Sequence, residues 1–157
     1  MLESVARNVF LTEPTASTMR IFFVMALILL VSCKDQTIKN ELTGTWNYDF
    51  EATRTEMETR GATQSEINFM ESLFRSLGQA QISFLDNGDL NFQMTDLSQK
   101  GTWELRDKGS TLAMDLTGSE QISAIDYLGG DTLILVPLNE EELSFPRVLT
   151  QQKDASE

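Results

Sequence analysis

The clearest structural signal in this chain is the segment Ile82-Ser-Phe-Leu-Asp-Asn-Gly-Asp-Leu-Asn-Phe-Gln-Met-Thr95. Apolar and polar residues alternate on both sides of Asn87-Gly88, and this alternation is typical of strands with one buried face. Asn-Gly is favoured in two-residue hairpin turns because both central positions need a positive φ. The segment therefore predicts an antiparallel hairpin. The side chains expected on its buried face are Ile82, Phe84, Leu90, Phe92 and Met94.

The same alternation continues toward the C-terminus. Turn residues such as Asp107-Lys108-Gly109-Ser110 and Gly129-Gly130-Asp131 interrupt it at short intervals, as expected between antiparallel strands. A polar tail, residues 151–157, ends the chain. Five further strands are therefore expected, at residues 101–106, 112–116, 122–128, 132–138 and 143–150.

One of these strands, residues 122–128, changes its apolar phase part of the way along. The shift between Ile122 and the pair Ile125/Tyr127 indicates a β-bulge. The bulge would turn Asp126 outward and Ile125 and Tyr127 inward. Without a bulge Asp126 would point inward, where a carboxylate needs a partner, and Arg147 is the candidate partner.

Upstream of the hairpin, the sequence predicts one strand and one helix. Apolar residues alternate with polar ones over residues 42–50, and a charged stretch, residues 52–61, follows. The segment 63–77 has apolar residues at helical spacing, with Thr63 and Glu66 forming a capping box. The apolar stripe expected on this helix is Ile67, Met70, Leu73, Phe74 and Leu77.

The order of elements is thus one strand, one helix and then seven strands joined by short turns. Consecutive antiparallel strands leave exposed edges unless the sheet closes on itself. The expected fold is all-β with one helix: an eight-stranded antiparallel up-and-down barrel over residues 42–150, with the helix between the first and second strands. A β-sandwich is the alternative.

The segment Leu42-Thr-Gly-Thr-Trp46 resembles the Gly-x-Trp signature in the first strand of lipocalins. The chain is similar to the lipocalin-like domains of bacterial lipoproteins. This resemblance implies that Gly44 and Trp46 close one barrel end, and that Arg147 from the last strand lies over the Trp46 ring. Two features depart from lipocalins. Their helix follows the eighth strand, whereas here it follows the first, as in fatty-acid-binding proteins, and a single cysteine permits no internal disulfide.

The N-terminal part of the chain resembles an export signal. Residues 21–31 are an unbroken apolar run, too short to span a bilayer comfortably but of the size found in signal peptides. Met19-Arg20 precedes the run and would supply a start and a positive charge. We therefore expect translation to start at Met19 and residues 19–32 to form a signal peptide. Residues 1–18 would then lie upstream of the true start.

The apolar run ends in Leu30-Val-Ser-Cys33, which resembles the lipobox of bacterial lipoproteins. The resemblance implies that Cys33 is acylated and becomes the new N-terminus, with residues 33–41 as a lipidated tether. The expected location is the bacterial cell envelope, on the periplasmic face or the surface of the outer membrane, with the membrane as partner. An ordinary signal peptide or an uncleaved anchor are the alternatives.

The composition excludes several kinds of chemistry. The 157 residues include no histidine and one cysteine, so catalysis by a Ser-His or Cys-His pair and thiolate zinc sites are excluded. Lys and Arg number 12 against 24 Asp and Glu, a net charge of −12, which argues against nucleic-acid binding. Acidic clusters such as Asp86/Asp89 are typical of turns. We expect no enzyme activity, no metal and no cofactor.

Two functions remain. In the first, the helix covers the open end of the barrel and a small hydrophobic ligand binds beneath it. In the second, large side chains fill the barrel, which serves as a non-catalytic interaction or structural module with a protein partner in the envelope. The residues expected to bind the ligand in the first case are Phe50, Ile67, Met70, Phe74 and Phe92.

Overall fold

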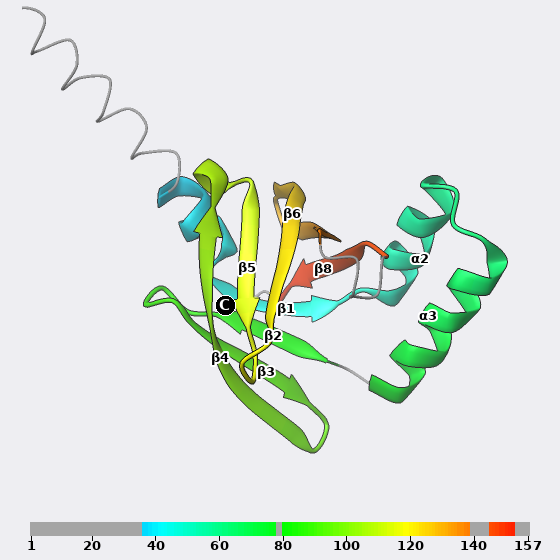
Figure 1. Cartoon of the computed structure of the whole chain (residues 1–157), viewed down its shortest axis with the longest axis horizontal. Helices are drawn as coiled ribbons and strands as arrows, with labels where there is room; N and C mark the ends of the chain where they lie inside the picture. Colours follow the sequence, from blue (N-terminus) through cyan, green and yellow to red (C-terminus); the bar gives the residue numbers. More distant parts are fainter. Residues whose placement is uncertain (1–35, 78–79, 139–144, 153–157) are drawn as a thin grey trace, which may run out of the picture. The chain divides into compact units, whose positions relative to one another are not determined.

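The computed structural model describes residues 36–77, 80–138 and 145–152. Within them, eight antiparallel strands follow one another in chain order and close into a barrel, because β1 pairs with both β2 and β8 (Figure 1). The predicted fold class is confirmed. The strands are β1 (Gly44–Tyr48), β2 (Gln81–Phe84), β3 (Asp89–Met94), β4 (Leu97–Arg106), β5 (Thr111–Asp115), β6 (Glu120–Gly129), β7 (Thr132–Pro137) and β8 (Arg147–Gln151).

The predicted hairpin forms β2 and β3. Phe84 pairs with Leu90 across the turn, and Gly88 has a φ of 88°. The Asn87 side chain accepts a hydrogen bond from the Asp89 amide at 3.0 Å, which tightens the turn. A short 3₁₀ turn, η1 (Asp107–Gly109), joins β4 to β5. Alternate residues of the strands, together with one residue that precedes β1, form the core of the barrel. Its buried members are Leu42, Trp46, Ile82, Phe84, Leu90, Trp103, Leu112, Met114, Leu133, Leu135 and Leu149.

The β-bulge in β6 is present, and it turns Asp126 outward as predicted. The pairing with β7 shifts register between Ile125 and Tyr127. The Asp126 carboxylate accepts a hydrogen bond from the Arg60 guanidinium at 2.6 Å, so it does not pair with Arg147 inside the barrel. The prediction for Tyr127 was wrong. Its side chain is 52% exposed, because the extra residue of the bulge moves Leu128 onto the core in its place.

Two helices, not one, connect β1 to β2. The predicted helix is α3 (Gln64–Leu77), and it has the expected capping box, with the Thr63 amide donating to Glu66 at 2.6 Å. The stretch expected to be a charged loop contains α2 (Phe50–Thr59). Asp49 caps this helix by accepting from the Ala52 amide at 2.9 Å. Its buried face consists only of Thr53 and Met57, a stripe too narrow to recognise among the surrounding charges.

Residues 36–42 are helical as well, although the sequence predicted a tether and the start of a strand there. Ile38 and Leu42 lie one helical turn apart, and both pack against the core of the barrel. The turn ends where the Thr43 amide donates to the Lys39 carbonyl at 3.0 Å. The described part of the expected tether is therefore an element of the folded domain.

The predictions for the N-terminal 35 residues fall outside the described part of the chain. These are the upstream region 1–18, the signal peptide 19–32 and the acylated Cys33. Residues 153–157 of the predicted polar tail also lie outside it. None of the helices that the structure describes is both long and apolar enough to span a membrane.

Candidate functional site

One end of the barrel is tightly filled, and we call it the closed end. The indole of Trp46 is 1% exposed, and its Nε1 donates to the Leu42 carbonyl at 2.8 Å. Trp103 packs edge-on against Phe84, with ring centroids 5.4 Å apart, and its Nε1 donates to the Leu85 carbonyl at 2.9 Å. Large buried side chains with satisfied indole donors thus occupy this end of the barrel.

The residues expected to close this end behave differently from one another. Gly44 has a φ of +143°, and a Cβ on it would lie 2.7 Å from Nε2 of Gln151. Trp46 is buried here, but Arg147 does not stack on it. β1 pairs Trp46 with Gln151, which places Arg147 about 13 Å away along β8.

The cation beside an indole is instead Lys39, from the helical turn 36–42. Its Nζ lies 5.9 Å from the centroid of the Trp103 ring. The expectation of an arginine over Trp46 is therefore corrected. A lysine over the other tryptophan supplies the cation–π contact at the closed end.

The opposite end of the barrel contains a cavity of about 490 Å³, which we call the end cavity. It lies beneath α3 and above the filled core, and Met114 and Ile82 form its floor. Its walls are mostly apolar. The apolar side chains around it are Tyr48, Leu73, Phe74, Ala80, Ile82, Phe92, Met114, Leu116 and Phe145.

A few polar side chains interrupt the apolar lining of the end cavity. The Arg147 guanidinium donates to Oε1 of Gln121 at 3.3 Å, and both residues line the cavity together with Gln99. Arg147 reaches this position because it shares the inward phase of Leu149 on β8. Apolar walls with a few convergent polar groups are typical of small-molecule sites.

The structure divides the five residues expected to bind ligand into three groups. Phe74 and Phe92 line the end cavity. Phe50 lines a neighbouring pocket. Ile67 and Met70 line neither of these two spaces, and they pack instead with Met57 of α2 in a separate core. The reason is α2, which packs against the apolar face of α3 that was expected to face the barrel.

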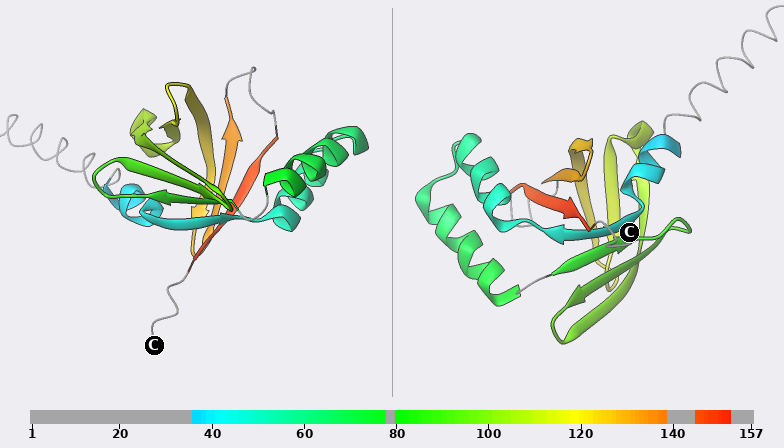
Figure 2. Two further views of the ribbon diagram at one scale, coloured as in Figure 1. Left: turned by 90° about the horizontal axis from the view of Figure 1, so that it is seen from below. Right: turned by 180° about the vertical axis from the view of Figure 1, so that it is seen from behind.

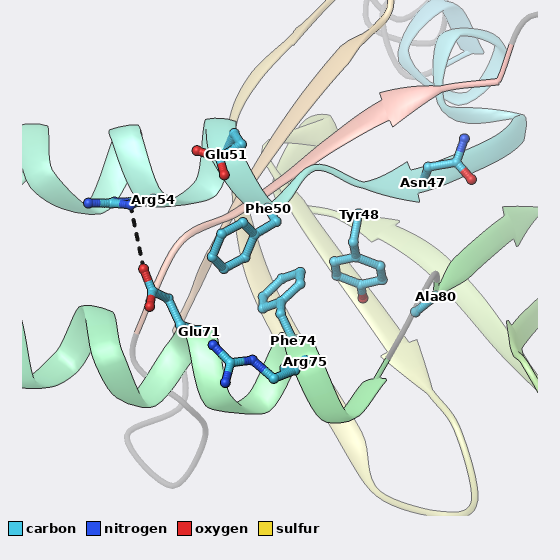
Figure 3. A pocket seen from close by; sticks show the side chains of 9 residues that line it. All are labelled: Asn47, Tyr48, Phe50, Glu51, Arg54, Glu71, Phe74, Arg75 and Ala80. Carbon is cyan, nitrogen blue, oxygen red and sulfur yellow. Dashed lines mark ion pairs between the residues drawn. The ribbon is translucent and has the colours of Figure 1, made fainter.

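The neighbouring pocket, which we call the outer pocket, has a volume of about 590 Å³ and lies between α2, α3 and β1 (Figure 3). Three aromatic rings line it. Phe74 lies between the other two, with centroids 5.6 Å from Phe50 and 6.0 Å from Tyr48. The charged and polar residues around the rings are Asn47, Glu51, Arg54, Glu71 and Arg75.

The electrostatics of the outer pocket centre on Arg54. Its guanidinium lies 3.0 Å from Glu58 and 3.5 Å from Glu71. The hydrogen bond with Glu58, its negative charge and that of Glu71 raise the pKa of Arg54. Since Arg54 and Glu58 are exposed and Glu71 is only partly buried, the ion pairs contribute little to stability. The guanidinium nevertheless offsets the negative charge of Glu71 where that residue lines the pocket.

Most residues of these pockets were not predicted as ligand contacts, among them Tyr48, Gln121 and Arg147. Strand phase was the available signal, because Tyr48 follows Trp46 and Arg147 precedes Leu149 at a spacing of two. Over residues 36–77, 80–138 and 145–152, no cluster of three acidic or cysteine side chains is arranged to hold a metal ion.

The fold and the end cavity define a small up-and-down β-barrel with a pocket at one end. No family model and no curated protein matches the sequence. Among solved structures, the chain is similar to a DUF4847 family protein from Bacteroides vulgatus ATCC 8482, with 15% identity and a TM-score of 0.41. The similarity covers 71% of this chain and 96% of that one.

Proposed function

We propose that this chain is a lipocalin-like, lipid-anchored protein that binds a small, mainly apolar ligand in the end cavity. The observation that carries the proposal is the cavity itself. Its volume of about 490 Å³ lies within the range of about 300–1,000 Å³ typical of small-molecule sites. Aromatic and aliphatic side chains would bury the ligand, and Gln121 and Arg147 would orient a polar group.

The filled half of the barrel sets the size of this ligand. Trp46, Phe84 and Leu90 are each at most 1% exposed, so the interior below Met114 offers no room. A ligand would therefore occupy the upper half only. The same filled half supports the second candidate, an envelope interaction or structural module whose barrel holds no ligand.

Attachment to the membrane through Cys33 belongs to the same proposal. Two or three acyl chains give stable retention where one does not. The chain has a net charge of −12, which would keep the domain away from anionic headgroups while the acyl chains hold it at the membrane. The expected location is the bacterial outer membrane.

The ligand proposal is tested with the neutral fluorescent probe N-phenyl-1-naphthylamine. Leu116→Trp adds an indole at the wall of the end cavity and is expected to abolish saturable probe binding. Leu85→Trp is the matched control, because Leu85 is 38% exposed and lies in the β2–β3 turn at the closed end. The control also accounts for probe taken up by the apolar segment 21–31 or by detergent.

Two results would contradict the proposal: no saturable binding by the unmutated chain, or equal binding by both variants. The first result would favour the filled structural module. Anchoring is tested separately by incorporation of radiolabelled palmitate in a bacterial host. Cys33→Ser is expected to abolish the label and release the protein from the membrane fraction, and label retained in Cys33→Ser would overturn this part.

A further inference from the structure

The end cavity and the outer pocket share part of their walls. Tyr48, Phe74 and Ala80 line both spaces. Tyr48 and Phe74 meet edge to face at 6.0 Å, so two side chains from different elements form much of the boundary. Figure 3 shows their rings next to each other, with Phe50 on the far side of Phe74. A ligand that leaves the end cavity beside Phe74 would enter the outer pocket directly.

Two acidic and two basic side chains line the outer pocket, so their formal charges cancel. Arg54 lies between Glu58 and Glu71. Glu51 lies in the first turn of α2, where the helix dipole stabilises a carboxylate. Arg75 pairs with no carboxylate among the residues that the structure describes. Of the two arginines of this pocket, Arg75 is therefore the one whose guanidinium is not held by an ion pair, and it lies beside the aromatic row (Figure 3).

From this arrangement we infer that the two pockets form one site for an amphipathic anion, such as an acyl chain with a carboxylate. The inference rests on the proposed function and names its ligand class. The apolar part lies in the end cavity, passes Phe74 and is followed by an anionic group at Arg75. Arg147 is less suited to bind the anion, because its guanidinium already donates to Gln121 and the residue has a further interaction.

The test compares cis-parinaric acid with its methyl ester, which has the same chain without the charge. Measurements at about pH 8 keep the carboxylate ionised. The unmutated chain is expected to bind the acid about fivefold more tightly than the ester, because a hydrogen-bonded charge pair near the surface contributes a modest free energy. Arg75→Gln is expected to remove this preference while leaving ester binding unchanged.

Lys100→Gln is the matched control, because it removes one positive charge from an exposed position on β4. The control is expected to keep the preference for the acid. Arg147→Gln tests the alternative position of the anion. Because Arg147 lines the end cavity, this variant is expected to weaken binding of the acid and of the ester to the same extent, so that the ratio of the two affinities is kept.

Two outcomes would overturn the inference while the proposed function stands. Either Arg75→Gln keeps the preference for the acid, or Arg147→Gln alone removes it, which would place the anionic group inside the end cavity. If the unmutated chain binds neither the acid nor the ester, the proposed function fails together with the inference. Binding of both probes with equal affinity would overturn the inference alone.

Discussion

The two ends of the barrel are built from the same strands but are packed very differently. At the closed end, the helical turn 36–42 lies against the strands, and both indole donors are hydrogen bonded. At the other end, α2 and α3 extend to one side of the barrel, as Figure 2 shows, and a cavity of about 490 Å³ remains. The two ends therefore have different roles: the closed end stabilises the fold, and the other end has space for a ligand.

The difference arises from where each helix places its apolar side chains. Ile38 and Leu42 of the turn 36–42 join the core of the barrel. Ile67 and Met70 of α3 join a separate core with Met57 and Phe145. Because α3 uses much of its apolar face against α2, it leaves the barrel end beneath it incompletely filled. The end cavity thus remains because α2 and α3 bury apolar side chains against each other and not inside the barrel.

The largest expected effect comes from Trp46→Ala at the closed end. Loss of a fully buried indole is expected to reduce the free energy of unfolding by about 3–5 kcal/mol. Guanidinium denaturation measures this, with Trp103 as the remaining fluorescent reporter. Phe69→Ala is the matched control, because Phe69 is 55% exposed and should change stability by less than about 0.5 kcal/mol. Similar losses in both variants would contradict the assignment of stability to this end.

Gly109→Ala is expected to have the next largest effect on stability, because the added methyl group would push the helical turn 36–42 away from the barrel. Gly109 has a φ of +81°, and a Cβ there would lie 2.5 Å from Cδ1 of Ile38. The backbone strain at this φ and the displacement of Ile38 together are expected to reduce the free energy of unfolding by about 1–2 kcal/mol.

The double variant Gly109→Ala/Ile38→Ala separates these two causes. Smaller alanine at position 38 removes the steric contact, so the effect of Gly109→Ala in this background should fall to the backbone strain alone. Denaturation midpoints of the four proteins measure the coupling. Full additivity of the two substitutions would contradict the packing of Ile38 on Gly109.

Phe92→Ala is expected to separate stability from binding at the open end. Phe92 is half-buried and borders the end cavity, so its truncation should cost only about 1 kcal/mol, well below the value for a fully packed aromatic residue. Binding of N-phenyl-1-naphthylamine should nevertheless weaken several-fold. A loss of stability as large as that of Trp46→Ala would show that the two ends are not distinct.

The smallest expected effect is a pH dependence of α3. The Thr63 amide and hydroxyl donate to Glu66 at 2.6 and 2.7 Å, and these hydrogen bonds lower the pKa of the Glu66 carboxyl. A carboxyl with a lowered pKa stabilises the fold above its ordinary pKa of 4.5, and this contribution is lost as the pH falls through the lowered value.

Urea midpoints of the unmutated chain and Glu66→Gln should therefore differ slightly at about pH 7 and converge as the pH falls below the lowered pKa of Glu66. Thr63→Ala removes the hydroxyl donor and should reduce the difference. A difference of the same size at both pH values would contradict this role for the carboxylate.

How far the sequence predicts the site depends on which element is considered. The hairpin at Asn87-Gly88 and the bulge near Asp126 were predictable, because turn chemistry and strand phase are local properties. α2 was not recognised, since its buried face is only Thr53 and Met57. That one omission changed the roles expected of Ile67 and Met70 from ligand contacts to packing.

The sequence by itself determined the strand order, the capped helix α3 and most of the inward residues of the barrel, because the period-two and helical spacings are properties of neighbouring positions. Only the tertiary structure decided which end is filled and where Arg147 lies. Those features depend on register between β1 and β8 and on the packing of α2 against α3. Contacts between distant segments set both, and no local pattern encodes them.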